Sequence, residues 1–252
     1  MNIFEINVLG FTIAPSYYGL MYALSFIIGY LIIRRRGYVK SILLDDLLFY
    51  IFLGVILGGR MGYVLFYNFS HYLSNLGDIL KIWEGGMSFH GGVIGVVIAM
   101  YIFSKKKKLN FYLLSDEVTA VLPIGLGLGR LGNYLNKELL GYSPYNGFLA
   151  IEKNGTSYFP SPLLESLLEG LFLYIILLYF YKKRQFGGQI ASLFLIVYGI
   201  FRLLVEIFFR EPDSHIGYIY NYFTVGEILT LPMIMLGLGL YIYLRKKNNV
   251  PL

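Results

Sequence analysis

The sequence contains no cysteine. This absence excludes structural disulfides, thiolate metal sites and a catalytic cysteine of the protein's own. Thiol chemistry at this protein would therefore need a thiol brought by the substrate. Charged residues are also scarce, at 14% of the 252 residues, whereas soluble domains carry about 25%. The low charge excludes an ordinary soluble domain.

Other functional signatures are missing as well. No cluster of histidine, aspartate and glutamate has metal-ligand spacing, and no Gly-x-Ser-x-Gly nucleophile elbow occurs. Residues 127–132 match the dinucleotide fingerprint G-x-G-x-x-G, but the fingerprint needs a preceding strand and here lies within an apolar run. We therefore expect no metal and no cofactor. The net charge of +6 does not indicate nucleic acid, because the basic residues form short clusters between apolar runs.

Long apolar runs dominate the composition. A helix needs roughly 20 apolar residues to cross the ~30 Å hydrocarbon core of a bilayer. We therefore expect an all-α, polytopic membrane protein of about seven transmembrane helices, formed by a single domain over residues 1–252. The seven predicted spans are residues 17–33, 43–67, 87–103, 118–134, 163–181, 189–209 and 225–244.

Basic clusters predict the orientation of these spans. The clusters are residues 34–36, 105–108, 182–184 and 245–247, after the first, third, fifth and seventh runs. With seven spans, all four clusters fall on one side, which the positive-inside rule assigns to the cytoplasm. We therefore expect the N-terminus outside, the C-terminus in the cytoplasm, and a small extracytoplasmic head built from the outer connecting segments.

Ionisable residues inside the apolar runs are the candidate functional groups, because intramembrane charge is costly and tends to mark function. They are Arg60, His90, Arg130, Arg202 and Glu206. The predicted topology places all of them toward the outer leaflet. Arg202 and Glu206 are four residues apart and so share one helical face.

Each of these residues also has a purely structural interpretation. Arg202 with Glu206 could be an ion pair that holds helices together, Arg60 could extend to the outer interface, and His90 could pack among glycines. These interpretations do not explain why three arginines, a histidine and a glutamate gather at one depth. Because arginine selects phosphate or carboxylate, the residues alone indicate a cationic pocket at the outer leaflet. Such a pocket would suit a phospholipid headgroup.

Six segments together resemble the prolipoprotein diacylglyceryl transferase family. The resemblance as a whole runs from the first to the seventh predicted span, and the G-R-x-G-N segment with the asparagine and glutamate after it is the most specific. The six segments are residues 18–22 (YGLMY), 58–68 (GGRMGYVLFYN), 83–92 (WEGGMSFHGG), 129–138 (GRLGNYLNKE), 198–206 (YGIFRLLVE) and 210–213 (REPD).

The resemblance implies a bacterial enzyme that uses phosphatidylglycerol as its lipid donor. Enzymes of this family transfer the diacylglyceryl group to the lipobox cysteine thiol in the signal peptide of a prolipoprotein. A thioether forms and glycerol 1-phosphate leaves. The implied location is the bacterial cytoplasmic (inner) membrane, with membrane lipid around the protein and the active site toward the periplasmic or external face. A thiol supplied by the substrate agrees with the absence of cysteine.

The resemblance also implies which residues form the site. It makes His90, Arg130 and Arg202 catalytic. Arg130 and Arg202 would hold the phosphate and stabilise it as it leaves, and His90 would help to deprotonate the thiol. The implied substrate-binding residues are Arg130, Tyr18, Arg60, Asn133, Asn136, Glu138, Gly141 and Glu206.

The chain departs from the family pattern in two places that bear on the site. Many members carry the sequence HPSQLYE before the fifth span, whereas residues 159–165 read FPSPLLE, so no histidine acts there. The spacing from Glu206 to Arg210 is one residue longer than usual, so the resemblance assigns no role to Arg210.

Two other functions compete with the transferase. One is a transporter or channel for an anionic solute, with arginines along its path, and the other is a lipid-binding structural subunit. Transporters usually bind their solute near the midplane and often contain related halves. Here the polar groups lie toward one side and the two halves do not resemble each other.

Overall fold

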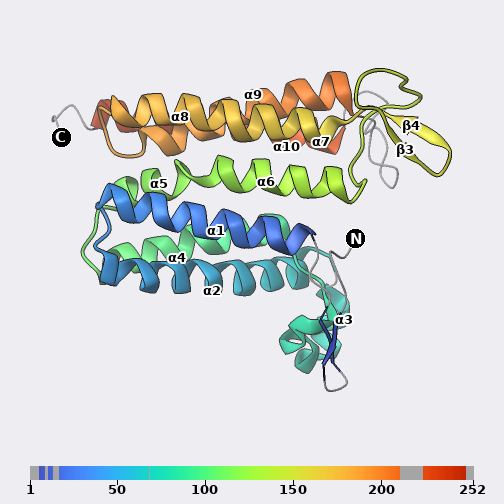
Figure 1. Cartoon of the computed structure of the whole chain (residues 1–252). Helices are drawn as coiled ribbons and strands as arrows, with labels where there is room; N and C mark the ends of the chain where they lie inside the picture. Colours follow the sequence, from blue (N-terminus) through green and yellow to red (C-terminus); the bar gives the residue numbers. More distant parts are fainter. Residues whose placement is uncertain (1–5, 9–10, 14–16, 68, 211–223, 248–252) are drawn as a thin grey trace. The chain divides into compact units, whose positions relative to one another are not determined.

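The computed structural model describes residues 6–8, 11–13, 17–67, 69–210 and 224–247, and this part of the chain is mostly helical (Figure 1). Two short antiparallel hairpins complete it, β1 (Ile6–Val8) with β2 (Phe11–Ile13) and β3 (Ile151–Lys153) with β4 (Thr156–Tyr158). The α-helices are α1 (Tyr17–Arg36), α2 (Ser41–Phe66), α3 (Phe69–Ser74), α4 (Phe89–Lys106), α5 (Phe111–Thr119), α6 (Leu122–Leu135), α7 (Ser161–Glu165), α8 (Leu173–Lys182), α9 (Gln189–Phe209) and α10 (Val225–Lys247). The 3-10 helices are η1 (Leu76–Leu80) and η2 (Ile82–Glu84), and η3 (Ser166–Phe172) is a π-helix.

Six helical segments of the described chain are long and apolar enough to cross a membrane. In an apolar 18-residue stretch of each, only 11% to 39% of the residues are buried, so many apolar side chains remain at least partly exposed. This confirms the prediction of an all-α, multi-pass membrane protein. The segments are Tyr17–Arg36, Ser41–Phe66, Phe111–Leu135, Ser161–Lys182, Gln189–Phe209 and Gly226–Lys247.

Helix α4 covers the third of the seven predicted spans but is not among these six. It is 18 residues long and ends in Lys105 and Lys106, whose charges lower its apolar character. The count of seven spans, with the orientation derived from it, therefore stays a prediction.

The chain divides into two compact units, and each is described here by itself. Unit 1 consists of Met1–Ile33 and Asp116–Leu252, and unit 2 is Arg34–Ser115. The prediction of a single domain over residues 1–252 stays a prediction.

In unit 2, α2 and α4 lie side by side along a ladder of glycines (Figure 1). A Cβ atom on Gly58 would lie 2.7 Å from the Gly95 Cα, and one on Gly62 would lie 2.7 Å from the Gly91 Cα. The order of these contacts makes the helices antiparallel. Small residues four positions apart let helix backbones approach closely in a membrane, so these glycines fix how the two helices pack.

In unit 1, α6 packs against the π-helix η3 in a similar way. A Cβ atom on Gly127 would lie 2.9 Å from the Gly170 Cα, and Ser166 Oγ donates to the Gly127 carbonyl at 2.9 Å. Gly127 is also the first glycine of the G-x-G-x-x-G match. In the structure this glycine serves helix packing. Next to this contact, α9 and α10 pack along each other.

The fourth predicted span is longer than the sequence indicated. It was expected to start at Val118, but the helical segment starts at Phe111 and is interrupted between Thr119 and Leu122, just before Pro123. Asp116 lies inside this longer segment. Its buried carboxylate accepts hydrogen bonds from the Gly188, Ile190 and Ala191 amides at 2.9, 2.9 and 3.0 Å, so it caps the start of α9.

Candidate active site

Two of the predicted arginines converge on one buried carboxylate in unit 1. Arg130 of α6 places Nε 2.7 Å from Glu165 Oε2, and Arg202 of α9 places Nη1 3.1 Å from the same oxygen. Glu165, the last residue of α7, has a fully buried side chain. The two guanidinium groups therefore meet at a single anionic oxygen, contributed by a third helix.

Arg202 is also held along its own helix. Its Nη2 donates to Glu206 Oε2 at 2.8 Å, and Thr224 Oγ1 donates to Glu206 Oε1 at 3.1 Å. A Cβ atom on Gly226 of α10 would overlap the Glu206 carboxylate, so the glycine makes room for it. The four-residue spacing therefore forms the ion pair that it predicted, and Glu206 fixes the direction of Arg202.

Arg210, to which the resemblance assigned no role, also lies here. It joins a charged cluster with Arg130, Glu165, Arg202 and Glu206. It follows the last residue of α9, and its Nη1 lies 3.6 Å from Glu165 Oε1. Burial lowers the pKa of the Arg210 guanidinium, and the positive charges of Arg202 and Arg130 lower it as well. The negative charges of Glu165 and Glu206 raise this pKa but do not outweigh the lowering. The positive groups are thus close enough to repel one another.

Two further glutamates and a tyrosine of the cluster were not singled out from the sequence. Glu165 and Glu169 both lie in the fifth predicted span, so the rule that flagged the arginines could have found them. Glu169 Oε2 is 3.5 Å from Arg130 Nε. Tyr198 of α9 interacts electrostatically with Glu169, Arg130 and Arg202.

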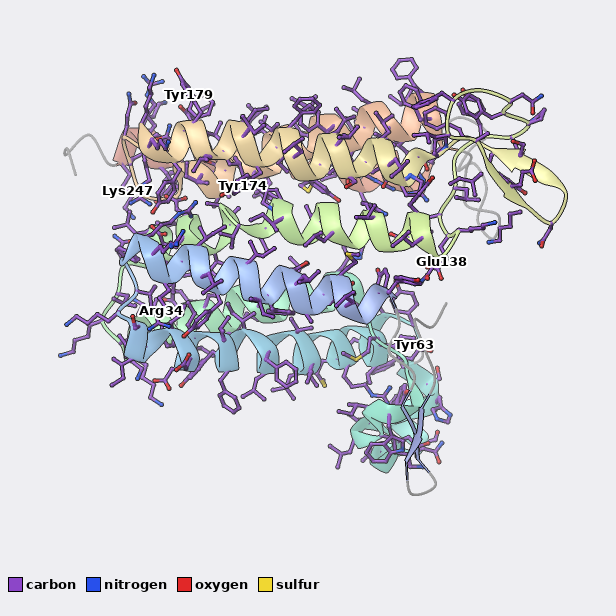
Figure 2. All side chains as sticks on the ribbon, viewed as in Figure 1. Arg34, Tyr63, Glu138, Tyr174, Tyr179 and Lys247 are labelled. Carbon is purple, nitrogen blue, oxygen red and sulfur yellow. The ribbon has the colours of Figure 1, made fainter. Side chains whose placement is uncertain are left out.

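The C-terminal end of α6 brings the predicted headgroup residues next to the arginines. Asn133 lies one turn after Arg130, is 5% exposed, and donates from Nδ2 to Glu138 Oε2 at 3.4 Å. Asn136 is the C-cap residue of α6, with its amide bonded to the Gly132 carbonyl at 3.0 Å. Glu138 lies at the end of unit 1 opposite Lys247 (Figure 2). The predicted site therefore lies away from the basic C-terminal end of α10.

Gly141 and Tyr18 contribute through packing in this structure. The Gly141 amide donates to the Phe159 carbonyl at 2.9 Å, and a Cβ atom on Gly141 would overlap the Phe209 carbonyl oxygen next to Arg210. The Tyr18 ring lies against Gly132, where a Cβ atom would be 3.0 Å from Tyr18 Cδ2. Both residues thus help to fix the helices that carry the arginines.

His90 and Arg60 belong to unit 2. His90 is the second residue of α4, and its side chain is exposed. Ser88 caps this helix, since Ser88 Oγ accepts from the Gly91 amide at 3.2 Å while the Ser88 amide donates to the Gly59 carbonyl at 2.8 Å. The start of α4, and with it the backbone of His90, is therefore tied to α2.

Arg60 uses its guanidinium on main-chain carbonyls. It is 4% exposed and lies 5.2 Å from the centre of the Tyr72 ring. Its bonds run to the carbonyl oxygens of Ile79 (2.9 Å), Gly85 (2.6 Å), Gly86 (3.2 Å) and Asp78 (2.5 Å). This side chain fixes the segment that leads from η1 to α4.

Asp78 links the same segment to its surroundings through its side chain. Its carboxylate contacts Lys81 Nζ at 2.7 Å and His71 Nε2 at 3.1 Å. The hydrogen bond from Lys81 holds the pKa of Asp78 below its usual value.

Among the described residues, no group of three or more histidine, aspartate and glutamate side chains could hold a metal ion.

Comparison with known proteins decides the family. The model of the family described as prolipoprotein diacylglyceryl transferase matches residues 5–243. The chain belongs to this family. A relative from Bordetella bronchiseptica, named phosphatidylglycerol--prolipoprotein diacylglyceryl transferase, is 44% identical over 240 residues, which is 92% of this chain and 91% of the relative.

Relatives of the same name from other bacteria are similar over comparable lengths. The one from Geobacter sulfurreducens is 42% identical over 243 residues, covering 93% of both chains. The one from Buchnera aphidicola is 41% identical over 268 residues, covering 93% of this chain and 94% of the relative. Membership of the transferase family confirms the resemblance found in the sequence and gives no support to a transporter or channel.

Proposed function

We propose that the protein transfers the diacylglyceryl group of phosphatidylglycerol to the lipobox cysteine thiol of a prolipoprotein signal peptide. The observation that carries the proposal is the shared oxygen of Glu165, which lies 2.7 Å from Arg130 and 3.1 Å from Arg202. Two guanidinium groups that meet at one carboxylate oxygen can also bind phosphate oxygens, because arginine matches the geometry of both groups. Family membership supports the same assignment.

In this mechanism the arginines act on the leaving group. The thiolate attacks the glyceryl carbon that carries the phosphate, the carbon–oxygen bond breaks, and the electron pair leaves with glycerol 1-phosphate. Arg130 and Arg202 stabilise the charge that develops on the phosphate. Glu206 orients Arg202 for this purpose through its 2.8 Å contact.

His90 is the proposed general base. A thiol has a reference pKa of about 8.5 and a histidine of about 6.5, so a nearby histidine can help to remove the thiol proton near neutral pH. Asn133 and Glu138, which contact each other at 3.4 Å, are proposed to bind the glycerol hydroxyls of the headgroup. The thiol must come from the substrate, because the sequence has no cysteine.

The direct test is incubation of the purified protein with phosphatidylglycerol and a lipobox peptide, followed by mass spectrometry. We expect a peptide that has gained one diacylglyceryl group. A peptide with serine in place of the lipobox cysteine is the control and should gain nothing. Neutral diacylglycerol should not act as a donor, because it offers no phosphate to the arginines. Transfer from diacylglycerol at a comparable rate would contradict the arginine assignment.

We further propose the bacterial cytoplasmic membrane as the location, with the active site toward the outside. The basis is the positive-inside rule applied to the four basic clusters. Reporter fusions after Lys108 and after Lys247 should both read cytoplasmic, and a fusion near Asn154 should read external. A cytoplasmic signal at Asn154 would overturn the seven-span orientation.

A further inference from the structure

Glu169 is a buried carboxylate that faces both phosphate-binding arginines without bonding tightly to either. Its side chain is fully buried, and neither oxygen has a hydrogen-bond partner among the described residues. Oε2 lies 3.5 Å from Arg130 Nε, and Oε1 lies 3.9 Å from Arg202 Nη1. Charge-assisted hydrogen bonds are normally 2.7–2.9 Å long, so Glu169 interacts with both arginines mainly through charge.

The fold holds Glu169 in this position. It lies in the π-helix η3, and the residue after it, Gly170, packs against Gly127 of α6 with their backbones in contact. Single π-helical turns inside α-helices occur frequently at functional sites. This contact fixes the backbone that carries Glu169 beside α6, the helix of Arg130.

The other two carboxylates of the cluster have closer partners. Glu165 receives Arg130 at 2.7 Å and Arg202 at 3.1 Å. Glu206 receives Arg202 at 2.8 Å and the Thr224 hydroxyl at 3.1 Å. Of these three carboxylates, Glu169 thus lies farthest from its nearest arginine nitrogen.

Counting charges shows what an added phosphate would do. With every group ionised, the glutamates at 165, 169 and 206 balance the arginines at 130, 202 and 210. A phosphodiester brings one more negative charge and draws the arginines toward itself. A buried carboxylate that loses its partners is neutralised more readily than it stays charged. The groups that face Glu169 are Arg130 on α6, Glu165 on α7, and Arg202 and Tyr198 on α9.

We propose that Glu169 takes up one proton from solvent when a phosphodiester lipid binds to Arg130 and Arg202. Donor binding is then coupled to proton uptake, and Glu169 is a positioning residue that sets the charge of the site. The proposal rests on the proposed function only for the identity of the ligand. Since the protonated carboxyl favours the bound state, binding is tightest at acid pH and weakens as pH rises.

The test is the number of protons taken up when short-chain phosphatidylglycerol binds to the purified protein in detergent. It is measured by titration calorimetry in buffers of different ionisation enthalpy, from about pH 5 to about pH 9. We expect the dissociation constant to rise by up to about tenfold per pH unit where one proton is taken up. Lack of proton uptake by the wild-type protein at every pH would overturn the proposal.

Three variants locate the effect. Glu169→Gln should bind the lipid without proton uptake and with a dissociation constant that does not change with pH. Glu169→Asp keeps a titratable group and should keep the uptake, which also covers the case in which the glutamine variant fails to fold. Glu152→Gln, at an exposed position of strand β3, is the matched control and should behave like the wild type.

Three results would place the proton elsewhere or separate the two proposals. Loss of the uptake in Glu165→Gln but not in Glu169→Gln would overturn the assignment to Glu169. A protein that gives the diacylglyceryl adduct but takes up no proton refutes only the coupling. A protein that binds the lipid with proton uptake but gives no adduct refutes only the transferase.

Discussion

Two segments of the chain share the pattern G-R-x-G and use its arginine in opposite ways. Residues 59–62 on α2 surround Arg60, and residues 129–132 on α6 surround Arg130. Arg60 donates to four main-chain carbonyls, whereas Arg130 contacts the carboxylates of Glu165 and Glu169. Carbonyl partners are fixed parts of the backbone, but a carboxylate can be exchanged for another anion. The partners, more than the local motif, therefore indicate which arginine can receive a phosphate.

The largest effect expected from this comparison is on Arg130. Arg130→Lys keeps the positive charge but loses the planar fork that matches carboxylate and phosphate geometry. The loss of one charge-assisted hydrogen bond costs about 1.5–3 kcal/mol, which is roughly a 10–150-fold loss of rate if it is felt wholly in the transition state. The measurement is diacylglyceryl transfer in detergent at equal amounts of folded protein.

Arg60→Lys should lower transfer less than Arg130→Lys does. A lysine ammonium can replace some of the four carbonyl contacts, and the expected defect is looser attachment of residues 75–88. Hydrogen exchange should therefore increase in that segment while transfer falls by less than about tenfold. If instead Arg60→Lys is inactive and Arg130→Lys is nearly normal, the phosphate site is centred on α2 and the assignment to α6 is wrong.

The glycines of the two motifs should have the smallest effects on transfer, and they form a matched pair for stability. A Cβ atom on Gly62 would lie 2.7 Å from the Gly91 Cα, whereas one on Gly129 would meet nothing within 4 Å. Gly62→Ala should destabilise the protein by about 1–3 kcal/mol because the helices must separate. Gly129→Ala should be neutral or stabilise it by up to about 1 kcal/mol. Thermal unfolding in detergent compares the two, and equal midpoints would refute the packing role of Gly62.

The spans could be predicted from the sequence because lipid imposes a simple rule on length and polarity. The predicted span at 189–209 coincides with α9 (Gln189–Phe209). The rule does not predict a charged residue inside a span when backbone amides from a distant part of the sequence bond to its side chain. Asp116 lies inside a candidate span because it bonds to the amides at the start of α9, 72 to 75 residues away in the sequence.

The site could be predicted in part, where its residues are close together in the sequence. Arg202 and Glu206 are paired as their four-residue spacing indicates. The bridge through Glu165 joins residues 35 positions apart on one side and 37 on the other, a relation that no local pattern contains. Arg210 enters the cluster because it follows α9 directly, and its Nε lies 4.0 Å from Glu206 Oε2.

The cap that Asp116 places on the start of α9 has a consequence for how the family can vary in length. An α-helix rises about 1.5 Å and turns about 100° per residue, so the cap fixes the rotational phase of α9 as well as its starting point. Arg202, about 20 Å further along, inherits that phase. One residue added between them would turn the arginine away from Glu165. Insertions and deletions in relatives should therefore fall in the connecting loops and leave the distance between the cap and the arginine unchanged.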